Sequence, residues 1–224
     1  MNSRIGIFGR ALAALAFAFG AQAWAQSDVG LVNQLAGDVS YASGSTTSKA
    51  QAFMKVREGD RFNVPAGGTL RIVYFNGGRQ ETFSGPASLT AGAQQSTVQT
   101  GAQPQVTTLP SGVPQKISQT PELIQIAKLG RSGGVAVRGA NPSERRLTAQ
   151  QQAEVRQARE TYEKMRTSAA QDDITPEIYL YSVLQDHLLY TDMKPVVEEM
   201  ARRQPGNADV AELVAYVKAK TETR

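Results

Sequence analysis

The sequence predicts an α+β protein in which an N-terminal antiparallel β-sandwich or barrel precedes a small C-terminal helical bundle. Between Phe53 and Gly92, turn signals recur every ~8–12 residues and separate short runs of β-branched and aromatic residues, a spacing typical of antiparallel sheets. From Leu147 onward, apolar residues recur instead at the spacing of one helix face. This change of period predicts two structural halves.

The N-terminus has the features of a secretory signal peptide. Arg4 and Arg10 form a positive region, Ala11 to Gly20 is an apolar run, and Ala23-Trp24-Ala25 fits a cleavage site before Gln26. The apolar run is shorter than the ~20 residues that span a bilayer. We therefore expect export to the periplasm with cleavage near Ala25/Gln26, and the alternative is a retained membrane anchor.

The strands of the N-terminal half are predicted between Gly-, Asn- and Pro-containing turns. Two short strands flank Gly37-Asp38, and Ser43 to Lys49 is predicted to be a polar loop. Thr69 to Phe75 is the strongest strand because it is rich in β-branched and aromatic residues. Asn76-Gly77-Gly78 suits a tight turn with positive φ angles, so Arg79 to Phe83 should return as the second strand of a hairpin.

Four helices are predicted in the C-terminal half. Thr148 and Gln151 form a capping box for the first, and Thr175-Pro176 opens the second, whose apolar residues cover more than one face. The third begins near Thr191, where Pro195 is acceptable only in the first turn. A fourth helix follows to the end of the chain. The second helix should be the most buried.

These patterns divide the chain into four segments. The segment rich in Pro, Gln, Ser and Thr between the halves is predicted to be a linker or strap with one short helix over Pro121–Leu129. The boundaries are residues 1–25 for the signal peptide, 26–99 for the β-domain, 100–146 for the connector and 147–224 for the helical domain.

The N-terminal half resembles the periplasmic domain of FecR-type proteins over about residues 29–98. The residues that carry the resemblance are Gly37-Asp38-Val39, the turn Val56 to Arg61, the strand Leu70 to Tyr74 with Asn76-Gly77-Gly78, and Gly85-Pro86. These are turn and core motifs. The resemblance implies an antiparallel β-domain with an interaction role in the periplasm.

The C-terminal half looks like a degenerate tetratricopeptide-type helical hairpin. Residues 174–207 have the length of one repeat, Leu180 occupies a position where a large apolar residue is expected, and Pro205-Gly206-Asn207 is similar to the end of a repeat. The resemblance implies a protein-binding helical surface. A plain small helical bundle is the alternative.

The sequence contains no combination of residues that predicts catalysis, a metal or a cofactor. There is no cysteine, and His187 is the only histidine, so it has no nucleophile or second imidazole to work with. Gly130 to Gly134 does not continue as a phosphate-binding loop, and Asp172-Asp173 is explained by a solvated loop between helices. We therefore predict that the protein is not an enzyme and has no small-molecule cofactor.

The hairpin is the candidate partner-binding surface. Arg71 shares one strand face with Phe75, while Tyr74 lies on the other, so an aromatic residue is exposed beside Arg79 and Glu81 unless both faces are covered. Coverage by a second sheet or by the helical half is the alternative, and we favour it.

These observations predict a non-catalytic, exported envelope protein that serves as a protein–protein interaction module, a scaffold or a sensor. The expected partner is a periplasmic or membrane-associated protein. The alternative is a module that binds envelope polysaccharide or peptidoglycan. An aromatic-lined groove on the β-domain would favour glycan, and an apolar groove on the helices would favour a protein. A nucleic-acid partner is not expected, since no aromatic residues interleave with the basic residues of the connector.

Overall fold

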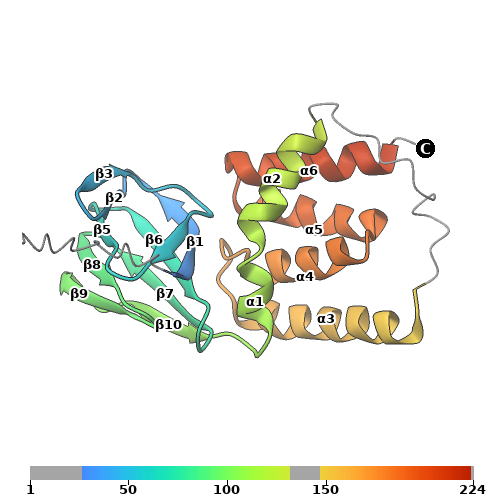
Figure 1. Cartoon of the computed structure of the whole chain (residues 1–224), viewed down its shortest axis with the longest axis horizontal. Coiled ribbons are helices and arrows are strands. Elements are labelled where there is room, and N and C mark those ends of the chain that lie inside the picture. Colours follow the sequence, from blue (N-terminus) through green and yellow to red (C-terminus); the bar gives the residue numbers. More distant parts are fainter. Residues whose placement is uncertain (1–26, 132–146, 223–224) are drawn as a thin grey trace, which may run out of the picture.

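The computed structural model describes residues 27–131 and 147–222, and the predicted signal peptide lies outside them. Ten strands come first and six helices follow (Figure 1). The strands are β1 (Asp28–Ala36), β2 (Ser40–Ser43), β3 (Thr46–Lys49), β4 (Lys55–Arg57), β5 (Arg61–Val64), β6 (Thr69–Tyr74), β7 (Arg79–Ser84), β8 (Ala87–Ala91), β9 (Ser96–Thr100) and β10 (Gln105–Thr108). The helices are α1 (Val113–Ile117), α2 (Thr120–Arg131), α3 (Ala149–Ser168), α4 (Thr175–Asp186), α5 (Tyr190–Arg203) and α6 (Ala208–Glu222).

The strands, which we call the β half, form two antiparallel five-stranded sheets. The first sheet has the order β10-β7-β6-β1-β4, and the second has the order β3-β2-β5-β8-β9. Their facing side chains form one apolar core that includes Phe62, Leu70, Tyr74, Phe83 and Leu89. The predicted α+β class is therefore confirmed, with a sandwich rather than a closed barrel among the described strands.

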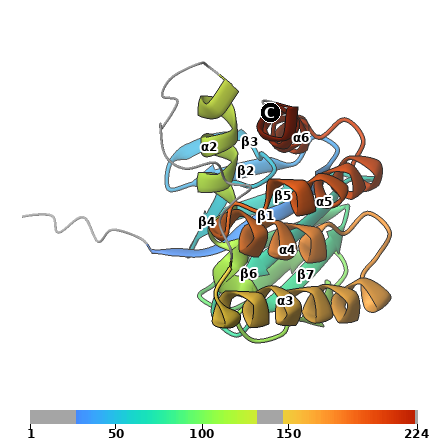
Figure 2. The ribbon, with the colours of Figure 1, turned by 90° about the vertical axis from the view of Figure 1, so that its right-hand side faces the viewer.

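The helices, which we call the helical half, lie against the first sheet. Helices α3 to α6 pack on one another in chain order, and α2 packs across α6 while α1 packs on α4 (Figures 1 and 2). Thr148 caps α3 through the predicted capping box with Gln151. Helix α4 has the largest share of buried residues, as its two apolar faces predict.

Both faces of the first sheet are covered. Ile72 and Tyr74 of β6 point into the sandwich core, whereas Leu31 of β1 and Val73 of β6 belong to the apolar core of the helical half. Alternation along a strand sends neighbouring side chains to opposite faces, so a strand that is apolar on both faces needs two covering layers. The first sheet is thus the middle layer of the molecule.

The connector contains more regular structure than the sequence indicated. Residues 105–108 form edge strand β10, and Leu109, Val113 and Ile117 are buried in the core of the helical half. The short helix predicted over Pro121–Leu129 is confirmed as α2. Few apolar residues mark this stretch, and although Val106, Ile126 and Leu129 are exposed, Leu109, Val113 and Ile117 lie in a core. Low average hydrophobicity hides such buried residues.

Two local predictions were wrong. The expected polar loop at Ser43–Lys49 contains strand β3, which pairs with β2 and is exposed along its whole length. An edge strand that buries nothing has no apolar alternation to reveal it. Helix α5 begins at Tyr190, so Pro195 lies beyond its first turn. Proline has no N–H, so one backbone hydrogen bond near the start of α5 is not formed. The helix nevertheless continues to Arg203.

The predicted hairpin turn is confirmed between β6 and β7. Gly77 has φ +81° and Gly78 has φ +64°, in the left-handed region that favours glycine. A Cβ at Gly77 would meet nothing within 4 Å, so the only cost of a side chain there is backbone strain.

Gly77→Val is therefore expected to lower the stability of the protein by about 1–3 kcal/mol, measured by thermal and urea unfolding. Gly77→Asn is the matched control, because asparagine tolerates the left-handed region and should lose much less. Gly44→Val is not a neutral control, since Gly44 also has a positive φ, +57°. Equal stability for Gly77→Val and the wild type would contradict the assignment of the turn.

Candidate functional site

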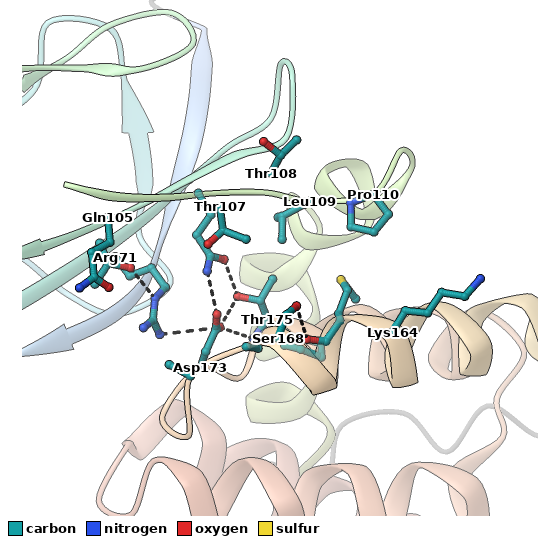
Figure 3. Close-up of a pocket in the computed structure, with 16 residues that line it drawn as sticks. Arg71, Gln105, Thr107, Thr108, Leu109, Pro110, Lys164, Ser168, Asp173 and Thr175 are labelled. Atoms are coloured by element: carbon teal, nitrogen blue, oxygen red, sulfur yellow. Dashed lines mark hydrogen bonds and ion pairs between the residues drawn. The ribbon is translucent and has the colours of Figure 1, made fainter.

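A row of polar side chains crosses the first sheet on the face toward the helices. Strand register places Gln105, Thr82, Arg71 and Gln34 side by side on β10, β7, β6 and β1. Gln34, Arg71 and the neighbouring Gln80 are buried. Buried polar groups require partners. The segment between α3 and α4, residues 169–174, provides them, and we call this contact region the junction (Figure 3).

Two arginines fix the α3–α4 segment before it meets the sheet. Arg166 donates to the carbonyl oxygens of Ala169, Ala170 and Asp173, at 3.1, 2.5 and 2.6 Å. Arg203 donates to the Gln171 carbonyl oxygen at 2.7 Å. These bonds satisfy backbone acceptors at the end of α3 and hold the loop in one conformation.

The same two arginines flank a fully buried carboxylate. Glu177 Oε2 lies 3.0 Å from Arg166 Nη1, and Glu177 Oε1 lies 3.3 Å from Arg203 Nε. Burial raises the pKa of Glu177, while the two guanidinium groups act to lower it. Tyr162 donates to Glu177 at 3.4 Å, and burial raises the pKa of Tyr162 to about 12. This cluster anchors α3, α4 and α5 to one another beneath the junction.

Asp173 is the centre of the junction. It is 3% exposed, and it accepts from Gln80 Nε2 at 2.7 Å and from the Thr175 backbone N–H at 2.9 Å. Thr175 Oγ1 lies 2.8 Å from Gln80 Oε1, and Asn33 Nδ2 donates to Thr175 Oγ1 at 2.5 Å. Asp173 therefore accepts from the first backbone N–H of α4 and binds the sheet with the same carboxylate. A carboxylate at a helix N-terminus is also favoured by the helix dipole.

Arg71 and Asp172 pair more loosely beside this centre. Arg71 Nε donates to Thr82 at 3.0 Å, but its terminal nitrogens lie 3.5 Å from Asp172 Oδ1 and 3.7 Å from Asp173 Oδ1. Among the residues that the structure describes, none accepts a hydrogen bond from Arg71 Nη1. Gln34 donates to Asp172. Burial acts to raise the pKa of Asp172. The Gln34 hydrogen bond and the charge of Arg71 outweigh burial and hold this pKa below its ordinary value.

A cavity of about 260 Å³ lies next to these contacts (Figure 3). One wall is the polar face of β7 and β10 with Arg71, and the other is the last turns of α3 with Lys164 and Met165. Leu109, Pro110 and Pro176 complete it. The walls offer hydroxyl, amide and cationic groups and contain no aromatic side chain.

The sequence-predicted site residues do not form a shared exposed patch. Tyr74 is fully buried, and its hydroxyl lies 2.7 Å from Ser96 Oγ. Glu81 is also fully buried and accepts from the Ser96 N–H at 3.0 Å and from Arg79 at 2.5 Å. Phe75 packs against the helical core, and Arg71 lies in the junction. The favoured expectation, that both faces of the hairpin are covered, is the one that the structure supports.

His187, which was singled out in the sequence, and two lysines of the connector are paired. His187 follows α4, and its Nε2 lies 3.2 Å from Glu154 Oε2. Lys116 pairs with Asp186, and Lys128 pairs with Asp209 at 2.7 Å. The Gly-rich stretch from Ser132 to Gly134 lies outside the described residues. Asp172-Asp173, expected in a solvated loop, instead binds the sheet, so that interpretation was wrong.

A second hollow is lined by the first half of α5 and the second half of α6. These parts of the two helices lie on the side away from the β half (Figure 1). It has a volume of about 580 Å³. Val197, Val214 and Val217 form its floor, and Val214 is half-exposed. Its rim alternates in charge: Lys194, Glu198, Lys218 and Glu222. We call this hollow the helical groove.

Within residues 27–131 and 147–222, no group of three or more His, Cys, Asp or Glu side chains could hold a metal ion. In the same part of the chain, no helix combines the length and apolar character needed to cross a membrane.

Comparison with known proteins gives no match: no family model, curated protein or solved structure matches this chain. The resemblances to FecR-type domains and to tetratricopeptide hairpins therefore stay predictions.

The sequence contains a signal for the junction that the sequence analysis did not recognise. Asn33, Gln34 and Arg71 are polar residues within strands that are otherwise mostly apolar, and a polar side chain in a buried strand needs a partner. What the sequence could not indicate is which loop supplies that partner. Asp173 is 93 residues from Gln80 in the chain.

Proposed function

We propose that this chain is a non-catalytic, exported protein that binds another protein in the periplasm, as a scaffold or a sensor module. The observation that carries the proposal is the helical groove. It combines the half-exposed Val214, which lies beside the buried Val197 and Val217, with a rim of both charges, and protein-binding grooves on helices usually have an apolar centre and a polar rim.

The junction supports the same proposal. Because buried polar contacts and a shared apolar core join the sheet to the helices, the two halves hold a fixed orientation. A fixed platform loses little conformational entropy when a partner binds to it. The glycan alternative has less support, since neither the junction cavity nor the helical groove contains an aromatic side chain for stacking on sugar rings.

Site-specific photocrosslinking in the native envelope tests the proposal. Benzoylphenylalanine at Lys194, on the rim of the groove, is expected to give one discrete crosslinked protein. The same probe at exposed Ser48 of β3 is the matched control and should give none. The crosslinked species should be in the periplasmic fraction with its N-terminus near Gln26. Equal crosslinking at both positions, or full-length chain in the cytoplasm, would contradict the proposal.

A further inference from the structure

The two edge strands of the first sheet differ in how they are protected against pairing with another chain. The edge strand β4 is charged: Lys55 pairs with Asp28 and with Glu122, each at 3.2 Å. The opposite edge, β10, has the sequence Gln-Val-Thr-Thr, with no charge and no proline. Charged residues and proline are the usual protection of an edge strand against pairing with another chain. The β10 edge lacks this protection.

The hydrogen-bond pattern shows which backbone groups β10 offers. The Leu109 N–H donates to the Gly78 carbonyl oxygen at 2.8 Å, and Thr107 pairs with Gln80 in the same register. In an antiparallel ladder, residues that bond to the partner strand alternate with residues that face away. The N–H and C=O groups of Val106 and Thr108 therefore point to the open edge.

The side chains of β10 offer different surroundings on its two faces. Val106 is 45% exposed on one face. On the other face, Gln105 and Thr107 line the junction cavity opposite the exposed Lys164. The other uncharged edge strand is β9. Its Val98 packs against the sandwich core, whereas Val106 of β10 is exposed.

The geometry points to β10 as the docking edge for an extended segment of a partner protein, with an acidic side chain of that segment directed to the junction cavity. Backbone bonds to Val106 and Thr108 supply affinity, and the cavity supplies specificity, as in other cases of strand addition. The acidic preference follows from the charged residues that line the cavity, in which Arg71 and Lys164 outnumber Asp173. Arg71 Nη1 has no hydrogen-bond acceptor among the described residues, so this nitrogen can still donate to a further carboxylate.

A segment of another protein fits this edge better than a second copy of the chain. Two copies paired through β10 would place Gln105 and Thr107 of one copy beside those of the other, and β10 carries no acidic residue for the cavity. This surface is separate from the helical groove, so the inference goes beyond the groove that carries the proposed function.

The probe is the peptide acetyl-Thr-Val-Glu-Val-Thr-amide with a fluorescein label, measured by fluorescence anisotropy. When a valine lies opposite Val106, the glutamate lies on the cavity face. The wild-type full chain is expected to bind it, and a peptide with lysine in place of glutamate is expected to bind about tenfold more weakly.

Val106→Pro removes an N–H that faces the edge and leaves the β7–β10 bonds in place, because those bonds use Gln105 and Thr107. It is expected to weaken peptide binding about tenfold or more. Val106→Thr keeps the N–H and is the matched control, with binding close to that of the wild type. Crosslinking from Lys194 should be unchanged in both variants, which separates failure of this inference from failure of the proposed function.

Modified peptides give a test that does not depend on the folding of a variant. N-methylation of both valines should abolish binding, since their N–H groups face β10, whereas N-methylation of the glutamate should be tolerated. No binding at millimolar peptide, equal binding by Val106→Pro, or the reverse methylation pattern would overturn the inference. A wild-type dimer that Val106→Pro converts to a monomer, without peptide binding, would overturn it in favour of self-pairing.

Discussion

Residues 147–224 expressed alone are expected to lack cooperative unfolding, although the sequence predicted a separable helical domain there. Val113, Ile117 and Ala127, from α1 and α2, are completely buried in the core of the helical half. Burying one Val or Ile side chain contributes about 1.5–3 kcal/mol, and a whole domain is stable by only about 5–15 kcal/mol. Loss of these residues therefore removes a large part of the available stability.

Circular dichroism during heating checks this expectation. The fragment 147–224 should show low helicity and a broad transition, and a fragment of residues 109–224, which restores α1 and α2, should recover helicity. A sharp transition of the shorter fragment near the melting temperature of the full chain would show that α3 to α6 form an independent domain.

Glu177→Ala is expected to destabilise the full chain by about 3–5 kcal/mol, the typical cost of removing one partner of a buried ion pair. Glu177 is fully buried, and its removal leaves Arg166 and Arg203 without their shared carboxylate. Because these arginines also hold the backbone of residues 169–173, the loss should extend to the junction.

Urea unfolding measures this loss. Glu160→Ala, on the exposed side of α3, is the control and should change stability by no more than about 0.5 kcal/mol. If Glu177→Ala and Glu160→Ala are equally stable, the buried cluster does not anchor the helices. An amide exchange measurement on Glu177→Ala should also show faster exchange at Asp173 and Thr175, whose backbone groups lie in the junction.

Local signals were enough to predict many elements of this fold. The pair Thr148 and Gln151 marked the start of α3, Asn76-Gly77-Gly78 marked the turn after β6, and the change of apolar period separated strands from helices. In each case the deciding interaction lies within a few residues of chain, so the sequence alone contains it.

The candidate sites were harder to predict from the sequence, because burial is not a local property. Tyr74 and Glu81 were candidates for a surface patch, and the structure buries both beneath the second sheet. Asp173 had the pattern of a solvated loop and became the buried centre of the junction. A strand with two apolar faces indicates two covering layers but does not identify them.

The sequence by itself determined the α+β class, the hairpin and the cap of α3, since each depends on short-range spacing or on backbone conformations that few residues adopt. Only the tertiary structure decided that the first sheet is a middle layer, that residues 105–131 belong to the packed halves, and that Asp172 and Asp173 meet Arg71 and Gln80. Those contacts join residues about a hundred positions apart, and which of the polar groups meet is fixed by how the sheet and the helices pack.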